Sequence, residues 1–241
     1  MSQVKLGDKN IPFIYQGNEL LYPNPIKDGL ILWYDFKGMK NNDVSKGIAR
    51  DLSGKGNDGT LQNFAYTNES GYDNGLKFDN VDDVVSLSLD IPMSFTLSIT
   101  IDFNINKDIQ FLCGGVLSAF YIRKNYNDLH ASVTTKSSTQ ITSMGGNRFF
   151  YQVSSSGKSK CQVTLSVDDT TKTMSIYGNG NLLNTREIGE QLKENKFTKL
   201  GVWQGNTNLD GKILSTTMYN RTLSDEEIQR NYKLEKERWG L

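Results

Sequence analysis

The sequence predicts an all-β protein with one large β domain, a short unit at its N-terminus and a helix at its C-terminus. Three observations support this. Short runs of β-branched and aromatic residues are separated along the chain by clusters of Gly, Asn, Asp, Ser and Thr, which favour turns. Gly occurs 22 times and Pro only 4 times among the 241 residues, as suits many tight turns. The strongest helix signal stands at the end of the chain.

A helix is predicted from Asp225 to about Arg238, because its first turn carries a complete set of capping residues. The hydroxyl of Ser224 can accept from free backbone N–H groups, and Glu227 can reach back to complete a capping box. Leu223 and Ile228 have the spacing of a hydrophobic staple. The acidic residues of the first turn also favour the positive end of the helix dipole.

The residues just before this helix predict the last strand of a sheet. Along it, Ile213, Ser215, Thr217 and Tyr219 alternate with Leu214, Thr216 and Met218. Because successive strand residues point to opposite faces, one of these two sets is expected to face the core. In the helix, three apolar residues are expected to pack on the β domain: Ile228, Tyr232 and Leu234.

The first 25 residues predict a small unit of their own. Gly7-Asp8 and Gly17-Asn18 suit two-residue hairpin turns, where positive φ is needed. They predict a three-stranded meander with strands at 4–6, 11–15 and 19–22. Such a meander is marginally stable alone, so it should lean on the main domain or on another protein; the alternative is an edge hairpin of that domain. Two prolines follow, so the chain divides into residues 1–25 and 26–241.

The remaining strands are predicted from short apolar or alternating runs bounded by turn residues. Lys136–Asn147 is polar and is expected to be a loop, and Gly178–Asn181 is expected to be a hairpin turn. In chain order, the predicted strands are 29–36, 76–78, 84–87, 95–103, 109–116, 120–123, 129–133, 149–153, 161–167, 174–177, 182–187 and 198–203.

Bulk properties exclude several classes of protein. Lys+Arg and Asp+Glu are both 27, which does not indicate a basic surface for nucleic acid. No apolar run approaches the roughly 20 residues of a membrane-spanning helix. The N-terminus lacks the apolar core of a signal peptide, so we expect the protein to be made and released in a cytoplasm. Cys113 and Cys161 lack metal-ligand spacing and are expected to be reduced.

Four stretches, in this order, resemble the motifs of laminin-G-like, concanavalin A-like lectin domains. They are GLILWYDF, DLSGKGNDGTL, LKFDNVDDVVSL and GKILSTTMYNRTLSDEEI. The resemblance covers residues 26–241, with Asn80 where Gly is usual and Val84 where Tyr is usual. It implies a two-sheet antiparallel jelly-roll sandwich that closes with a strand and a helix. The N-terminal segment resembles those of tail and baseplate proteins of bacteriophages of Gram-positive bacteria.

Catalysis is not indicated. His130 is the one histidine, and no G-x-S-x-G elbow, H-E-x-x-H or P-loop is present. Jelly-roll glycosidases need two carboxylates that flank the scissile bond. The E-x-D-x-x-E string of related glucanases is missing, and adjacent Asp82 and Asp83 would point to opposite faces of a strand. We therefore expect a protein that is not an enzyme.

Calcium is a candidate ligand, because it is held by carboxylate, amide and carbonyl oxygens on loops. Two loops supply such groups, and domains of the resembling family often bind one calcium in comparable loops. The alternative is that these side chains bond their own loop backbones. The candidate ligands are Asp51, Asn57, Asp79, Asp82 and Asp83.

Glycan binding is predicted from aromatic residues that stand beside amides and charged groups. One set is Trp203, Gln204 and Asn206; the other is Tyr121, Arg123 and Tyr126. Each aromatic could instead belong to the core or to a protein interface.

The resemblance implies a phage virion protein of the tail or baseplate. Its jelly roll would contact the host cell surface, through a cell-wall glycan or teichoic acid, during adsorption. Residues 1–25 would dock it to other tail or baseplate proteins, for example by strand addition, and it would be an oligomer in the virion. No nucleic-acid or membrane partner is expected. The alternatives are a structural spacer without a ligand and a glycan-degrading enzyme.

Overall fold

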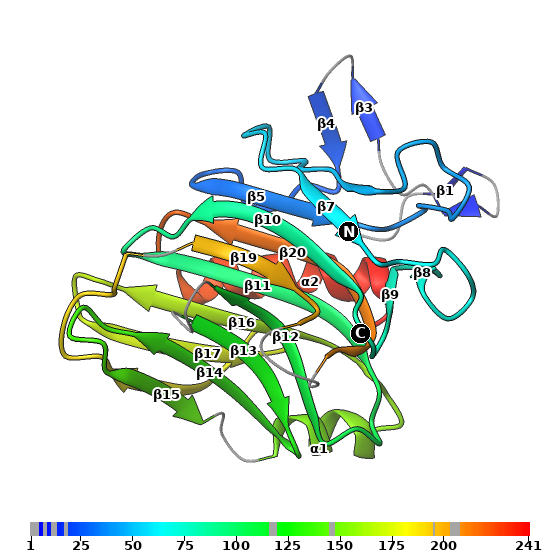
Figure 1. Ribbon diagram of the computed structural model, residues 1–241. Helices are drawn as coiled ribbons and strands as arrows, with labels where there is room; N and C mark the ends of the chain where they lie inside the picture. The colour runs from blue at the N-terminus through cyan, green and yellow to red at the C-terminus, as the bar shows by residue number, and fades with distance from the viewer. Residues whose placement is uncertain are drawn as a thin grey trace.

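Two antiparallel β-sheets pack face to face, with one helix behind them (Figure 1). The predicted all-β sandwich with a C-terminal helix is therefore confirmed. The computed structural model describes residues 5–6, 9–10, 14–16, 19–115, 120–144, 148–194, 196–202 and 208–241. None of the helices in those ranges is long and apolar enough to cross a membrane.

The front sheet, nearest the viewer in Figure 1, has the strand order β15-β14-β13-β12-β19-β10-β7-β6. Its strands in chain order are β6 (Ile48–Ala49), β7 (Gly59–Gln62), β10 (Val84–Asp90), β12 (Ile109–Gly115), β13 (Phe120–Asn125), β14 (Asp128–Thr134), β15 (Gln140–Met144) and β19 (Lys196–Leu200).

The back sheet has the order β18-β17-β16-β11-β20-β9-β8, and β5 also pairs with β20. Its strands are β5 (Leu30–Asp35), β8 (Gly71–Tyr72), β9 (Leu76–Asp79), β11 (Phe95–Phe103), β16 (Lys160–Asp168), β17 (Thr173–Gly178), β18 (Asn181–Glu187) and β20 (Asp210–Tyr219). Apolar side chains from both sheets, such as Leu97, Val163 and Phe120, fill one core between them.

A bulge in β20 overturns the simple alternation predicted for that strand. Ile101 pairs with Ile213, but Thr100 pairs with Ser215, so Leu214 is left over between them. An extra residue of this kind shifts every later side chain to the other face. Ile213 therefore joins the central core, whereas Ser215 bonds to the helix behind the sheet.

Two predictions of local structure in the main domain were wrong. Residues 149–153 form a helix, α1 (Phe149–Ser155), in which the buried side chains are Phe149, Phe150 and Val153. A five-residue apolar run cannot distinguish a helix from a strand. The predicted 136–147 loop contains β15, an edge strand of mixed polar and apolar residues whose one pairing among the described strands is with β14.

The described N-terminal residues form two strand pairs, which differ from the predicted three-stranded meander. β1 (Lys5–Leu6) pairs with β2 (Lys9–Asn10), and β3 (Ile14–Gln16) pairs with β4 (Glu19–Tyr22). Tyr22, at the end of β4, hydrogen-bonds to Arg238 near the end of the C-terminal helix. The N-terminal unit thus contacts the sandwich, and the division after residue 25 stays a prediction.

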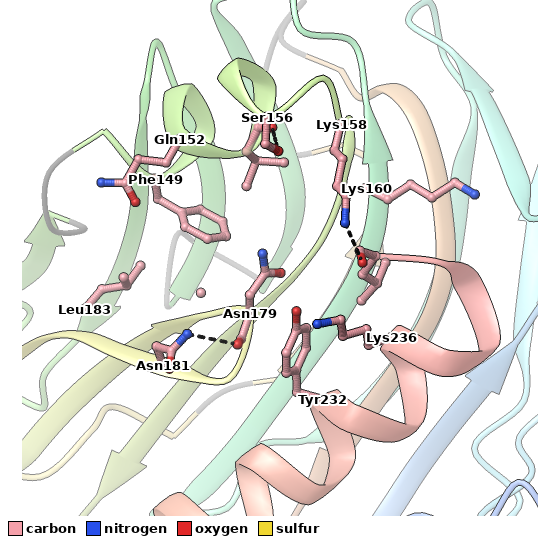
Figure 2. Close-up of a pocket in the computed structure, with 13 residues that line it drawn as sticks. Phe149, Gln152, Ser156, Lys158, Lys160, Asn179, Asn181, Leu183, Tyr232 and Lys236 are labelled. Carbon is pink, nitrogen blue, oxygen red and sulfur yellow. Dashed lines mark hydrogen bonds between the residues drawn. The ribbon is translucent and has the colours of Figure 1, made fainter. Parts of the chain in front are cut away.

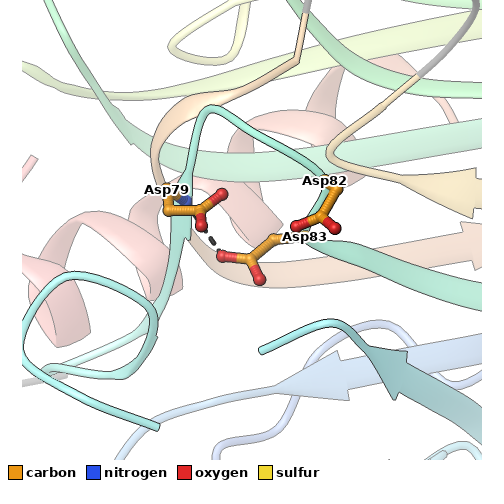
Figure 3. A group of neighbouring side chains, drawn as sticks. All are labelled: Asp79, Asp82 and Asp83. Atoms are coloured by element: carbon orange, nitrogen blue, oxygen red, sulfur yellow. Dashed lines mark hydrogen bonds between the residues drawn. The ribbon is translucent and has the colours of Figure 1, made fainter. Parts of the chain in front are cut away.

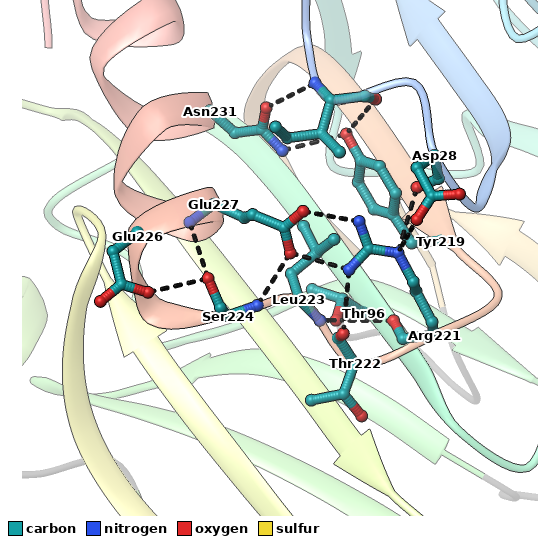
Figure 4. Close-up of polar contacts among 11 residues, drawn as sticks. Asp28, Thr96, Tyr219, Arg221, Thr222, Leu223, Ser224, Glu226, Glu227 and Asn231 are labelled. Atoms are coloured by element: carbon teal, nitrogen blue, oxygen red, sulfur yellow. Dashed lines mark hydrogen bonds and ion pairs between the residues drawn. The ribbon is translucent and has the colours of Figure 1, made fainter.

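The C-terminal helix α2 (Asp225–Trp239) begins as predicted. Ser224 accepts from the backbone N–H of Glu227, whose carboxylate accepts from the backbone N–H of Ser224 (Figure 4). Leu223 and Ile228 are buried in one cluster, as a hydrophobic staple requires.

The face of α2 that packs on the back sheet is polar, whereas apolar residues were predicted to pack there. Asn231, Glu235 and Arg238 are buried, whereas Tyr232 and Leu234 are only partly buried. Arg238 bonds to Asp35 of β5, and Ser215 of β20 bonds to Glu235. These groups satisfy one another because α2 covers a back-sheet face on which Ser98 and Thr164 are also buried.

Candidate functional site

A pocket of about 300 Å³ lies where α1, the β17–β18 hairpin and the end of α2 meet (Figure 2). This is the candidate functional site, and we call it the hairpin pocket. The residues that line it are Phe149, Gln152, Val153, Ser156, Lys158, Lys160, Gly178, Asn179, Asn181, Leu183, Tyr232, Lys236 and Leu241.

Two aromatic rings lie on different sides of the hairpin pocket. The ring of Phe149 rests against the backbone of Gly178, so closely that a Cβ on Gly178 would lie 2.3 Å from a ring carbon. Tyr232 of α2 is partly buried beside Gly180. Figure 2 shows the amide of Asn179 between these two rings. Phe149 is only 4% exposed and belongs to the core, so Tyr232 supplies the apolar face against which a sugar ring can pack.

The hairpin turn holds Asn179 in a fixed orientation. Asn179 and Gly180 have φ values of 51° and 75°, as the predicted two-residue turn requires. The Oδ1 atom of Asn179 accepts from the backbone N–H of Gln162 at 3.0 Å. This bond fixes the amide orientation, so its Nδ2 group is directed away from β16 and is available as a donor. The Nε2 group of Gln229 in α2 donates to the carbonyl of Gly180 at 2.6 Å, which holds the turn against the helix.

Three lysines bring positive charge to the hairpin pocket. Lys158 donates to the carbonyl of Leu241 at 2.9 Å, and Lys160 donates to that of Trp239 at 3.1 Å. Lys236 is exposed, with its Nζ 5.9 Å from the centre of the Tyr232 ring. Burial raises the pKa of Tyr232, so its hydroxyl stays protonated at neutral pH. Within the described part of the chain, no Asp or Glu side chain lines the pocket.

The structure brings together two of the three residues in one predicted glycan set. Tyr121 and Arg123 are two residues apart on β13, and the guanidinium of Arg123 lies over the rings of Phe111 and Tyr121, 5.4 and 5.2 Å from their centres. Tyr121 is buried, with an exposed fraction of 6%, and therefore offers little surface to a sugar. Tyr126 lies in the β13–β14 turn, where it is 56% exposed. The other predicted set, Trp203, Gln204 and Asn206, falls outside the described residues.

His130 lies opposite Arg123 in the pairing of β13 with β14. Burial, with the nearby charge of Arg123, lowers its pKa. Its Nδ1 atom is buried and makes no hydrogen bond. A histidine that serves as a general base needs a group to orient its other nitrogen, and Nδ1 has none here.

Asp79, Asp82 and Asp83 form an acidic cluster in the β9–β10 loop (Figure 3). One carboxylate oxygen of each lies within 4.8 Å of the others. Asp83 is buried and accepts from the backbone N–H of Asp79 at 2.9 Å and from Ser70 at 3.0 Å. Burial raises the pKa of Asp83 to about 6, despite these hydrogen bonds. Three converging carboxylates, one of them buried, are a donor set that fits a hard cation such as calcium.

The other predicted metal ligands do not join this cluster. Both carboxylate oxygens of Asp51 bond to its own loop, through the backbone N–H groups of Ser53 and Asn57 and the hydroxyl of Ser53. Asp51 also accepts from the backbone N–H of Trp33 at 2.9 Å. The side chain of Asn57 donates to the carbonyl of Ile31. Asp51 and Asn57 are therefore placed to fold the loop and fix it to β5.

The hairpin pocket was not predicted from the sequence. Its walls come from residues 149–160, 178–183 and 232–241, which are far apart in the sequence. The Asn-Gly turn was the one local signal, and it predicted the hairpin without what packs around it. The pocket also depends on α1, which was predicted as a strand.

Comparisons with known proteins show a shared fold. The structure resembles the receptor-binding domain of a botulinum neurotoxin C/D mosaic serotype, with a TM-score of 0.66, 17% identity, and coverage of 86% of this chain and 52% of that one. It also resembles the binding domain of Paraclostridial Mosquitocidal Protein 1, with a TM-score of 0.65 and 14% identity, over 86% of this chain and 52% of that one. A third similar structure is the botulinum neurotoxin serotype D ligand-binding domain in complex with N-acetylneuraminic acid. Its TM-score is 0.65 and its identity 18%, over 86% of this chain and 51% of that one.

The chain thus spans about half the length of these structures. No family model and no curated protein matches the sequence. What the comparisons establish is the sandwich itself, an architecture that occurs in binding domains of bacterial toxins.

Proposed function

We propose that this protein is a carbohydrate-binding module and that the hairpin pocket holds the sugar. The observation that carries the proposal is the pocket's composition: the partly exposed ring of Tyr232, a fixed amide and lysine side chains around about 300 Å³. Small-ligand sites typically combine apolar walls with a few well-placed polar groups. The similar toxin domains support the proposal, since one of them was solved with N-acetylneuraminic acid.

We further propose that the module belongs to a bacteriophage tail or baseplate and contacts the host cell surface. The support is the N-terminal segment, which resembles those of such proteins. The hairpins of residues 1–25 would dock the module to neighbouring virion proteins, in an oligomer, and leave the hairpin pocket available to the cell-wall glycan. The protein would then reside in the virion after its synthesis in the host cytoplasm.

Binding without cleavage is expected. A glycosidase needs two carboxyl groups about 5 to 9.5 Å apart around the scissile bond. The described lining of the hairpin pocket contains no carboxylate side chain. We therefore favour a binding module over a glycan-degrading enzyme, and over a spacer without a ligand.

Cosedimentation with purified Gram-positive cell walls tests this function. The wild-type chain should bind saturably, and Tyr232→Ala should weaken binding because it removes one of the aromatic rings. Tyr151→Ala is the matched control, since Tyr151 is an exposed tyrosine of α1 that does not line the pocket. Equal binding by both variants would contradict the proposed site, and release of soluble sugar fragments would contradict the non-catalytic role.

A further inference from the structure

The charge of the hairpin pocket restricts the kind of sugar that it can hold. Apart from Tyr232, the ionisable side chains in its described lining are Lys158, Lys160 and Lys236. The chain as a whole is neutral, with 27 basic and 27 acidic residues, so this gathering of lysines is local. A pocket in which basic side chains outnumber acidic ones attracts ligands of negative charge.

The hydrogen-bonding groups of the pocket are mostly donors, which also favours a negatively charged ligand. An ammonium group has three donors and no acceptor. Lys158 uses one donor on a backbone oxygen of Leu241 and keeps the others for a ligand, whereas the Lys160 side chain points away from the pocket (Figure 2). Asn179 presents its Nδ2 group, because its Oδ1 atom is occupied by the backbone N–H of Gln162. A site rich in donors suits a ligand rich in acceptor oxygens.

We propose that the hairpin pocket takes negatively charged units of a cell-surface glycan, namely sugars or polyols that carry a carboxylate or a phosphate. This inference rests on the proposed carbohydrate-binding function and specifies the ligand class of the same site. The anionic group would bond to the ammonium groups of Lys158 and Lys236, since charge-assisted hydrogen bonds are the stronger ones. The uncharged part of the unit would pack against the ring of Tyr232.

Matched ligands test the charge requirement directly. Isothermal titration calorimetry would compare N-acetylneuraminic acid with its methyl ester, which keeps the ring and removes the charge. A second pair, glycerol phosphate and glycerol, distinguishes a phosphate from a carboxylate. In at least one pair, the anion should bind more tightly than its neutral partner, and added salt should weaken its binding.

Neutral variants locate the effect. Lys158→Gln and Lys236→Gln should each lower the affinity for the anion about two- to fivefold and leave the affinity for the neutral ligand unchanged. Lys233→Gln is the matched control on the same helix, because Lys233 is exposed and does not line the pocket. Its affinity for the anion should equal that of the wild-type chain.

The outcomes separate this inference from the proposed function. Equal affinity for both members of each pair, or an equal loss in Lys233→Gln and Lys236→Gln, would overturn the anionic preference. Cell-wall binding that depends on Tyr232 would then still support a neutral glycan in the same pocket. If the folded wild-type chain bound neither these ligands nor cell walls, both proposals would fail.

Discussion

Arg221 and Glu227 face each other through two parallel hydrogen bonds, 2.7 Å from Nη1 to Oε2 and 2.6 Å from Nη2 to Oε1 (Figure 4). The Nε atom of Arg221 also lies 2.8 Å from the carboxylate of Asp28, just before β5. One guanidinium therefore ties the corner after β20 to the first turn of α2 and to the start of the domain. The position of α2 matters for function because its last turns form a wall of the hairpin pocket.

The Arg221–Glu227 pair predicts a pH dependence of stability. The hydrogen bonds from Arg221, opposed by burial, lower the pKa of Glu227 to about 2. A carboxylate whose pKa is lower in the folded state stabilises the fold above its unfolded pKa, about 4.3. This contribution is lost as the pH falls from about 5 toward 2. Because the pair is partly exposed, we expect it to be worth about 1 kcal/mol or less.

Glu227→Gln isolates that charge, because glutamine can still complete the capping box. The free energy of unfolding of this variant, measured by urea denaturation, should be lower than that of the wild type at pH 7. The difference should shrink by pH 2.5. Glu187→Gln, at an exposed position of β18, serves as the control. A constant difference across this range would show that the charge of Glu227 does not stabilise the fold.

Gly178→Ala should deform the hairpin pocket. The added Cβ would lie 2.3 to 2.8 Å from three carbons of the Phe149 ring, so the ring would have to move. Overpacking of this kind costs about 1–3 kcal/mol of stability. Thermal denaturation should show a lower melting temperature, and cell-wall binding should weaken at temperatures where the variant is folded. Gly47→Ala is a control for the loss of a glycine outside this contact, because a Cβ there meets only the Tyr66 hydroxyl, at an ordinary 3.7 Å.

The ion pair beneath α2 predicts a large loss of stability. The side chains of Arg238 and Asp35 are both fully buried. Arg238→Met leaves the carboxylates of Asp35 and Glu235 buried without this partner, which costs about 3–5 kcal/mol. Arg230→Met, at an exposed position of the same helix, should change the unfolding free energy little. If the two variants were equally stable, the buried pair would not anchor α2.

Calcium is expected to bind the acidic cluster of Asp79, Asp82 and Asp83. A ligand that binds only the folded state raises its stability, so added calcium should raise the melting temperature and a chelator should reverse the shift. Asp82→Asn should reduce this effect, and Asp90→Asn, at an exposed position paired with Lys196, should keep it. An identical calcium response in both variants would place any calcium site elsewhere.

The sequence correctly predicted those elements that are determined by residues close together in the chain. β11 covers Phe95–Phe103 as predicted, because its side chains alternate without interruption. The helix start at Ser224 followed from one capping box. In contrast, α1 was predicted as a strand because the helical arrangement of Phe149, Phe150 and Val153 depends on their packing beside β14.

The site depended on tertiary contacts that no local pattern encodes. Asn231, Glu235 and Arg238 were not among the residues predicted to pack on the β domain, yet they are buried because the facing sheet offers polar partners. Tyr121, which was predicted to bind glycan, is also buried, and the guanidinium of Arg123 lies over its ring. Lys236 joins Lys158 at the hairpin pocket only when α2 packs on the sandwich.

The most direct test of the central claim is an NMR titration of the isotopically labelled chain with glycan fragments from Gram-positive cell walls. Saturable shifts are expected at the side-chain amides of Asn179 and Gln152 and at the backbone amides around Lys236, which line the hairpin pocket. Shifts confined to other surfaces, such as the turn at Tyr126, would contradict the assignment of the site. The absence of any saturable shift in a folded sample would contradict the claim that this protein binds glycans.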